Sequence, residues 1–321
     1  MISAYRDIKW LEVNEAKEGG TRESYKFKKE YGEILYRYIK KEVGEINGIN
    51  YFDIASYRGA EGPYVLWAEK GREEELITEF KQEFEHYCQD QHIIAEFAKL
   101  DPWDQYSEYI KQVYDAQYYG NFYCNNLEID FYKEEYNRRA KRSIKKAINA
   151  GITVRKDFTG ITIPQFVELY KNTEDKFHTS DYYRMTESDI RKFFETFGED
   201  AFLINAYLNE EIITSVLVVM GKDVEHYLLL GSNPQYLDLQ ANSLLTYEAA
   251  LYGQKTNRKL FDMGGGKAGG GIEQFKLNFS SEKGIWPYYV IEKVYDEEIY
   301  DEFVRRKGKV ENTKFFPLYR G

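Results

Sequence analysis

The sequence predicts a two-domain α/β protein in which helices flank mixed β-sheets. The chain has 321 residues, which is more than one ordinary hydrophobic core accommodates. Its second half alternates strand and helix patterns in a regular order, β-α-α-β-β-β-α-β-α-β, and the first half has a shorter α/β pattern. We therefore expect one domain over residues 1–125 and a second over 126–321.

In the first half, residues 25–43 place apolar side chains at helical spacing and are expected to form a helix. Residues 51–56 and 64–69 are expected to be strands around a glycine-containing turn. A second amphipathic helix follows, with Leu76 and Phe80 on its apolar face, and then a strand at 92–100.

The second half begins with one or two strands near 121–132 and a charged helix that Gly151 ends in a left-handed conformation. Strands are expected at 152–157, 201–208, 211–221, 224–231, 259–263 and 286–294, and helices at 163–177, 186–198, 240–257 and 272–279. The Asn-Glu turn between the second and third of these strands is the strongest hairpin signal in the chain.

Composition excludes several classes of function. The net charge is −10, which argues against a broad nucleic-acid surface and against genomic nucleic acid as a partner. Two cysteines and four scattered histidines form neither a disulfide framework nor a zinc pattern, so no metal is expected. The N-terminal segment lacks a signal-peptide core, and no apolar run is long enough to span a membrane. We expect a cytoplasmic protein, for which peripheral membrane contact stays open.

The stretch "DMGGGKAGGGIEQFKLNF" (262–279) concentrates glycines between an expected strand and a short helix. Gly264, Gly266 and Gly269 match G-x-G-x-x-G, but a dinucleotide site needs a complete βαβ unit, and only one further strand follows. A Walker loop is excluded because Ala268 follows Lys267. The remaining readings are a surface loop and a loop whose backbone approaches a ligand.

The element order of the second half resembles that of the GNAT acyltransferase fold. Four stretches further resemble the Fem-type aminoacyltransferases of peptidoglycan bridge formation: "YFDIASYRGAEGP", "AKLDPW", "RRAKRSIKKAINAGITVR" and the long run from "HYLLLGSNPQ" to "IEQFKLNF". The resemblance implies tandem GNAT-like domains, each with a mixed, centrally splayed sheet, in which acyl donor and amine meet between two parallel strands.

The resemblance also implies roles for individual residues. Lys276, in the Phe-Lys pair, is expected to stabilise the oxyanion; the alternative is a solvated helix lysine. Tyr227 is expected to donate or relay a proton, although it is one of 30 tyrosines and a packing role is the alternative. Asp101 is expected to hold or deprotonate the amine, or merely to start a turn. Substrate binding is assigned to Tyr57, Arg58, Asn242, Gly264, Gly265, Gly266 and Phe275.

A basic stripe lies on the expected helix after residue 133. Arg138, Arg142 and Lys145 share one face at i, i+4 and i+7, which suits a polyphosphate or a tRNA backbone, with a solvated helix face as the alternative. Arg184 is assigned to an acceptor carboxylate or phosphate.

Two departures narrow the function. The segment "GSNPQYLDLQANSLL" lacks the glycines with which acetyl-CoA-using GNAT enzymes bind pyrophosphate, and no heptad run provides the coiled-coil arm of some Fem enzymes. We expect an N-acyltransferase without a permanent cofactor, using aminoacyl-tRNA as donor and an amine of a UDP- or lipid-linked envelope precursor as acceptor. The alternatives are a GNAT-like enzyme with a CoA or carrier-protein donor and a catalytically silent binding protein.

Overall fold

The computed structural model describes residues 1–56, 59–177, 184–265, 269–310, 312 and 315–321. Two compact units result: unit 1 comprises Met1–Val13 and Gly120–Trp286, and unit 2 comprises Asn14–Tyr119 and Pro287–Gly321. A single boundary after residue 125 does not describe this division, because each end of the chain packs into the unit formed mainly by the other half. The backbone N–H of Ala4 bonds to His226 in unit 1, and Phe303 packs against Tyr51 in unit 2.

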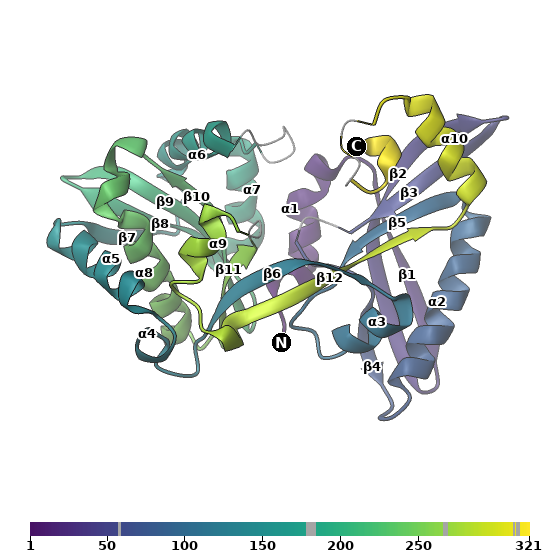
Figure 1. Cartoon of the computed structure of the whole chain (residues 1–321), viewed down its shortest axis with the longest axis horizontal. Helices are drawn as coiled ribbons and strands as arrows, with labels where there is room; N and C mark the ends of the chain where they lie inside the picture. Colours follow the sequence, from purple (N-terminus) through teal and green to yellow (C-terminus); the bar gives the residue numbers. More distant parts are fainter. Residues whose placement is uncertain (57–58, 178–183, 266–268, 311, 313–314) are drawn as a thin grey trace. The chain divides into compact units, whose positions relative to one another are not determined.

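Unit 1 contains a six-stranded mixed sheet, drawn with its helices in Figure 1. Its strands run in the order β6-β11-β10-β9-β8-β7. They are β6 (Gln117–Asn126, entering unit 1 at Gly120), β7 (Thr153–Asp157), β8 (Ala201–Leu208), β9 (Glu211–Met220), β10 (Val224–Ser232) and β11 (Leu260–Gly265). Its helices are α1 (Ile8–Glu18, up to Val13), α4 (Phe131–Glu134), α5 (Arg138–Asn149), α6 (Ile163–Phe177), α7 (Glu187–Phe197), α8 (Ala241–Lys255) and α9 (Gly271–Lys276). These elements confirm most of the strands and helices expected there, but the single charged helix expected after residue 133 is two helices, α4 and α5, and α4 begins inside the region 121–132 expected to be strand.

Among the described strands of unit 1, β10 and β11 are the one parallel pair, and they separate after three residue pairs. Pairing covers Val224–His226 of β10 and Leu260–Asp262 of β11. Beyond that point β10 has a bulge between Tyr227 and Leu229 in its pairing with β9, and the register of β11 against β6 shifts between Asp262 and Gly265. The divergence predicted for these strands is therefore confirmed.

Helices cover both faces of the unit 1 sheet. The core of α5 and α8 includes the fully buried Ala147 and Leu245. On the other face α6 lies directly on β10. The contact is so close that a Cβ at Gly231 would collide with the backbone of Leu169 and Tyr170. Trp10 of α1 packs on Phe193 of α7, which fixes the start of the chain to this face.

Unit 2 has a second mixed sheet in the order β1-β2-β3-β5-β12, with β4 paired to β2. The strands are β1 (Thr21–Lys29), β2 (Gly32–Ile46), β3 (Ile49–Ala55), β4 (Tyr64–Ala68), β5 (Ile93–Lys99) and β12 (Ile285–Val294, in unit 2 from Pro287). The helices are α2 (Glu73–Asp90), α3 (Ser107–Tyr114) and α10 (Glu297–Lys307). The last strand expected for the second domain, 286–294, thus pairs with β5 in unit 2.

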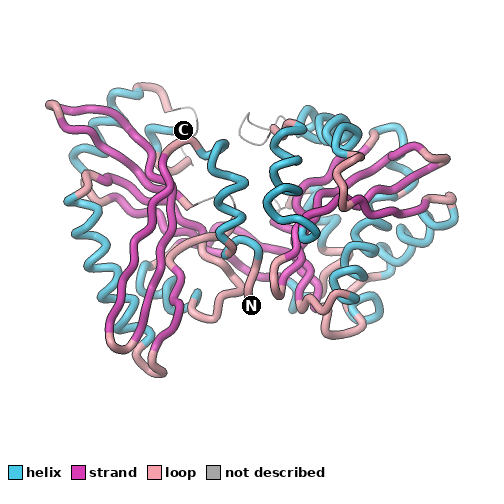
Figure 2. The backbone as a smooth tube through the Cα atoms, turned by 180° about the vertical axis from the view of Figure 1, so that it is seen from behind, coloured by secondary structure: helices cyan, strands magenta, loops and turns pink. Residues whose placement is uncertain are grey.

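The helix expected over residues 25–43 is wrong, because these residues form the long β1–β2 hairpin (Figures 1 and 2). Ile34, Tyr36 and Tyr38 are fully buried and follow the period of two that a strand requires. The same run also fits helical spacing, and its aromatic and β-branched content decides for a strand.

The parallel strand pair of unit 2 stays joined as far as the structure describes it. β3 pairs with β5 from Phe52 to Ala55, and the Ser56 N–H then bonds to the Phe97 carbonyl at 2.8 Å. The tandem fold class is therefore confirmed, and the central splay is seen in unit 1. Within the described ranges, no helix combines the length and the apolar composition needed to cross a bilayer.

Candidate active site

The glycine-rich segment carries Lys276 back to the point where β10 and β11 part. Lys276 is the last residue of α9, and its Nζ donates a hydrogen bond to the carbonyl of Gly265 at the end of β11. Gly264 has φ +75°, a left-handed conformation that favours glycine. A Cβ at Gly264 would lie 3.5 Å from Nζ, so the loop backbone and the ammonium are in direct contact. Gly266 and Lys267 lie outside the described residues.

The Lys276 side chain is half-buried against the loop. Burial lowers its pKa to about 8, and the nearby Asp262 and Cys124 act in the opposite direction. A cation in such a site interacts more strongly with a developing negative charge than it would in water. The geometry therefore suits stabilisation of an oxyanion at the open end of the strand pair.

A buried histidine–aspartate pair lies directly under this loop. His226 is the last residue of β10 that pairs with β11. Its Nδ1 lies 3.0 Å from Oδ2 of Asp262, and both side chains are almost fully buried. The other oxygen, Oδ1, accepts the backbone N–H of Gly264 at 2.7 Å. Neither residue was predicted from the sequence.

The short helix α9 is also fixed from its own side chains. Glu273 accepts hydrogen bonds from the Tyr123 hydroxyl and from the Gly269 N–H, and these bonds hold the pKa of its carboxyl below the usual value. The Phe275 ring packs on Phe279 with centroids 4.8 Å apart. Phe275 is thus half-buried against the core and anchors α9, while its assignment to substrate binding stays a prediction.

Tyr227 is the first residue of β10 beyond the part that pairs with β11. Its hydroxyl donates to Oδ1 of Asn242 at 2.8 Å, and its ring packs edge-on against Phe261. Burial raises the pKa of the phenol, and a hydrogen bond with Thr246 acts in the opposite direction. The phenol is therefore neutral near pH 7 and retains a proton that it can donate. The structure thus brings Tyr227 and Asn242 together.

Further assigned residues are Asp101, Arg184, Tyr57 and Arg58. Asp101 lies in unit 2 and its Oδ1 accepts the backbone N–H of Trp103 at 2.9 Å, the arrangement expected of a turn-forming aspartate. Arg184 is exposed ahead of α7 in unit 1. Tyr57 and Arg58 lie outside the described residues.

The basic helix α5 begins beside the end of α9. Asn137 caps α5 by accepting the N–H groups of Arg139 and Ala140. The Asn137 backbone N–H and side-chain amide also bond to Asn278, both at 3.0 Å. Because Asn278 is two residues beyond Lys276, the exposed stripe that starts at Arg138 begins next to the lysine segment.

The connection from β10 to α8 uses its own backbone donors. The N–H groups of Gln235 and Tyr236 bond to Asn233, those of Gln240 and Ser243 bond within the same segment, and a 3₁₀ turn fills Pro234–Leu239. A pyrophosphate needs unsatisfied N–H donors of this kind. The segment therefore lacks a ready anion cradle.

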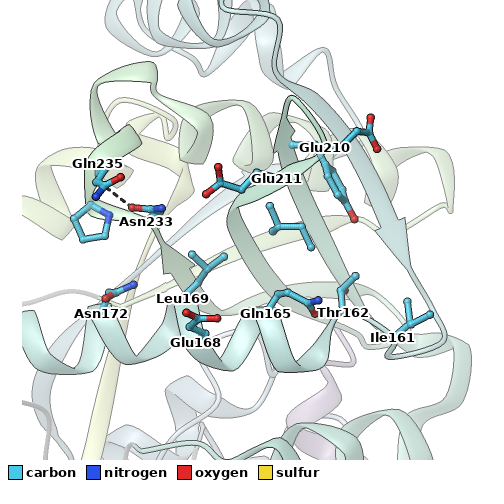
Figure 3. Close-up of a pocket in the computed structure, with 13 residues that line it drawn as sticks. Ile161, Thr162, Gln165, Glu168, Leu169, Asn172, Glu210, Glu211, Asn233 and Gln235 are labelled. Carbon is cyan, nitrogen blue, oxygen red and sulfur yellow. Dashed lines mark hydrogen bonds between the residues drawn. The ribbon is translucent and has the colours of Figure 1, made fainter.

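A pocket of about 850 Å³ lies beside this connection. Figure 3 shows side chains of α6 on one side of it and those of residues 210–211 and 233–235 on the other. Glu168, Glu210 and Glu211 line it, and none of its lining residues is a lysine or an arginine. Arg155 bonds to both carboxylate oxygens of Glu210 and offsets its charge, so Glu168 and Glu211 are the carboxylates that disfavour an anionic group here.

His226 and Asp262 could not be predicted from local sequence, because their pairing depends on tertiary contact. His226 and Asp262 lie 36 positions apart, and their contact requires the parallel register of β10 and β11. Within the described ranges no three histidine, cysteine or acidic side chains group as metal ligands.

Comparisons with known proteins identify a matching domain and structures of similar fold. A family model described as an acetyltransferase (GNAT) domain matches residues 135–277. The crystal structure of FemX is 12% identical with a TM-score of 0.67, covering 92% of this chain and 93% of that chain. L-PGS from Bacillus licheniformis is 11% identical with a TM-score of 0.51, covering 93% and 94%.

A conserved protein of unknown function from Bacteroides thetaiotaomicron is 9% identical with a TM-score of 0.58, covering 91% of this chain and 90% of that chain. A comparison with curated proteins gave no match. The matched GNAT domain spans the open strand pair and Lys276, and the FemX likeness extends over both units. Residues 135–277 therefore match a GNAT domain, and the chain as a whole has the fold of FemX.

Proposed function

We propose that this protein is an N-acyltransferase that moves an aminoacyl group from aminoacyl-tRNA to an amine of a UDP- or lipid-linked cell-envelope precursor. The observation that carries the proposal is the position of Lys276, a largely desolvated cation held against the loop where β10 and β11 separate. The GNAT domain match and the likeness to FemX support acyl transfer as the reaction class.

In the proposed reaction the amine nitrogen attacks the carbonyl carbon of the aminoacyl ester. A C–N bond forms, the carbonyl oxygen takes the negative charge, and Lys276 stabilises that charge. Collapse of the intermediate breaks the bond to the ribose oxygen, which needs a proton. Tyr227, neutral and half-buried at the same divergence, is the proposed donor. The proton that the attacking nitrogen loses returns to the phenolate, so that no net proton is consumed.

The charges of unit 1 favour a tRNA donor over an acyl-CoA donor. Arg138, Arg142 and Lys145 form an exposed cationic stripe that begins beside the segment of Lys276, and such a stripe attracts a phosphodiester or polyphosphate. The connection after β10 offers satisfied N–H groups and neighbouring carboxylates where a CoA pyrophosphate would need donors.

A transfer assay tests the proposal. The purified protein is incubated with a labelled pool of aminoacyl-tRNAs and a UDP-linked peptide bearing a free amine, and the labelled amide is quantified. We expect product with wild type and with Lys283→Met, an exposed lysine of the same unit, and almost none with Lys276→Met. Absence of product with every charged tRNA in the pool would contradict the tRNA donor.

A second candidate, an acetyltransferase with a CoA donor, is favoured by the description of the matching domain. Calorimetric titration with acetyl-CoA separates the two. The proposal predicts no tight binding, and a micromolar affinity accompanied by acetyl transfer would establish the second candidate. Tight binding of an envelope precursor without transfer from either donor would instead indicate a binding protein.

A further inference from the structure

The buried pair of His226 and Asp262 has no part in the bond-making steps assigned above, yet it lies between the sheet and the lysine loop. His226 is 0% and Asp262 1% exposed. Burying a carboxylate beside an imidazole is costly unless each polar atom has a partner. The partners recorded for the pair therefore indicate what it holds in place.

The start of the chain fixes the histidine. The Ala4 N–H donates to His226 Nε2 at 3.1 Å, and the Tyr5 ring lies on the imidazole with centroids 4.3 Å apart. A backbone N–H can only donate, so Nε2 is the acceptor and the ring proton is on Nδ1. That proton is donated to Asp262 Oδ2 at 3.0 Å.

The aspartate in turn fixes the loop that meets Lys276. Asp262 Oδ1 accepts the N–H of Gly264 at 2.7 Å, and the next carbonyl, that of Gly265, accepts the Lys276 ammonium. A continuous series of hydrogen bonds thus runs from Ala4 through the imidazole and the carboxylate to the loop backbone and the lysine.

The same carboxylate also acts on the lysine through its charge. Burial is the main influence on the pKa of Lys276 and lowers it, while Asp262 on β11 and Cys124 on β6 raise it. The acidic group on the lysine's own helix, Glu273, is bonded to Tyr123 and Gly269. Asp262 is therefore the carboxylate whose charge keeps Lys276 protonated.

We propose that His226 and Asp262 are positioning residues that, together with the backbone of residues 2–5, hold the glycine loop and the Lys276 ammonium in place for the reaction. The catalytic importance of this role rests on the proposed function of Lys276, whereas the coupling of Asp262 to Lys276 does not. An imidazole locked by a backbone N–H gives one orientation to the carboxylate, as outer-shell partners do for other reactive groups.

The test measures the pKa of Lys276 directly, without turnover. The full chain is labelled competitively with acetic anhydride across a pH series, and modification of Lys276 is read by mass spectrometry. In Asp262→Asn the reactivity midpoint should shift to lower pH, because the raising charge is lost. Glu225→Gln is the matched control, since Glu225 is a neighbouring buried acid on β10 that is not among the groups whose charge shifts the pKa of Lys276.

Two histidine variants test positioning separately. Gln at 226 can donate to Asp262 and accept from Ala4, whereas Phe can do neither. If the transferase activity is found, His226→Phe should lower kcat up to about 10²-fold through misplacement of the lysine, His226→Gln should retain more activity, and KM for the acceptor should stay unchanged.

An unchanged Lys276 midpoint in folded Asp262→Asn would overturn the proposal. If Asp262→Asn does not fold, equal lysine reactivity profiles of His226→Gln, His226→Phe and wild type would overturn it instead. If the wild type shows no transferase activity in any assay but Asp262→Asn still shifts the midpoint of Lys276 reactivity, the proposed function is contradicted. The positioning of Lys276 remains supported in that case.

Discussion

Each unit contains one parallel strand pair, and the two pairs end differently. In unit 1, β10 and β11 stop pairing after His226 and Asp262, and Lys276 bonds to the loop beyond. In unit 2, β3 and β5 pair to Ala55 and Phe97. There the Ser56 hydroxyl accepts the Lys99 N–H at 3.1 Å. The backbones of Glu61 and Lys99 also form an isolated antiparallel β-bridge.

This difference assigns the two units different tasks. An acyl carbonyl can approach the backbone between two strands only where the strands are no longer hydrogen-bonded to each other. The parallel pair of unit 1 meets that condition. Unit 2 uses the corresponding polar groups, through Ser56 and Lys99, to keep its pair joined. We therefore propose that catalysis takes place in unit 1, and we expect changes to the joined pair of unit 2 to affect stability instead of turnover.

The largest expected effect is that of Lys276→Met, which removes the charge but keeps the alkyl chain. We expect kcat to fall by about 10²–10³, or roughly 2.7–4 kcal/mol, as for deletion of an oxyanion-hole donor. KM for the acceptor should change little, because the ground-state carbonyl carries little charge. Steady-state kinetics with Lys283→Met as control measures this, and full turnover of Lys276→Met would disprove the catalytic role.

The pH dependence should follow the same ammonium. Because the pKa of Lys276 is lowered to about 8, the cation is lost above that pH, and kcat should fall about tenfold per pH unit as expected for one ionisation. Hydroxylamine as acceptor isolates this limb, since its nitrogen is already neutral. A rate that stays flat from pH 7 to 10 would contradict a cationic role.

Stability should change in the opposite direction over this range. The folded-state pKa of about 8 lies below the ordinary value of 10.5, so the unfolded chain binds more protons between these values. The free energy of unfolding should therefore rise with pH there, relative to Lys276→Met. Chemical denaturation of wild type and Lys276→Met at each pH measures this free energy. The same curves show whether a fall in activity at high pH is caused by unfolding.

A smaller effect is expected from strain in the loop. Gly264→Ala forces a side chain into φ +75° beside the lysine, and kcat should fall about tenfold if the displacement is a fraction of an ångström. Gly269→Ala is the matched control, because Gly269 has φ +73° and open space around its Cβ position. Similar stability losses with similar kcat losses in both variants would contradict a specific role for the Gly264 backbone.

The smallest effect on turnover is expected in unit 2. Ser56→Ala leaves the Lys99 N–H without its acceptor, which should lower the free energy of unfolding by about 1–2 kcal/mol. Turnover per folded molecule should be unchanged. Chemical denaturation and kinetics on the same sample decide this, and a large fall in kcat without a stability change would move part of the site into unit 2.

The sequence allowed much of unit 1 to be predicted, because its elements carry clear local signals. The Thr186 capping box and the Asn209–Glu210 turn with positive φ each follow from neighbouring residues. Residues 25–43 were misassigned, since their apolar positions fit periods of both 2 and 3.6. No local sequence pattern indicates that Met1–Val13 packs into unit 1 or that Pro287–Gly321 packs into unit 2.

The candidate site shows the same limit. Lys276 and the glycines could be identified from one contiguous stretch and its family resemblance. His226 and Asp262 could not, because an imidazole on one strand and a carboxylate on another become partners only through strand register. The Ala4 contact is further still from local reasoning, as 222 positions separate its two residues.

The most direct test of the central claim is the binding of a transition-state analogue. A phosphonate that joins the aminoacyl and amine portions carries a negative charge where the oxyanion forms, and the corresponding amide product is neutral there. Calorimetry should show that Lys276→Met loses about 10²–10³ in affinity for the phosphonate and almost none for the amide. Equal losses for both ligands, or no loss for the phosphonate, would contradict the account.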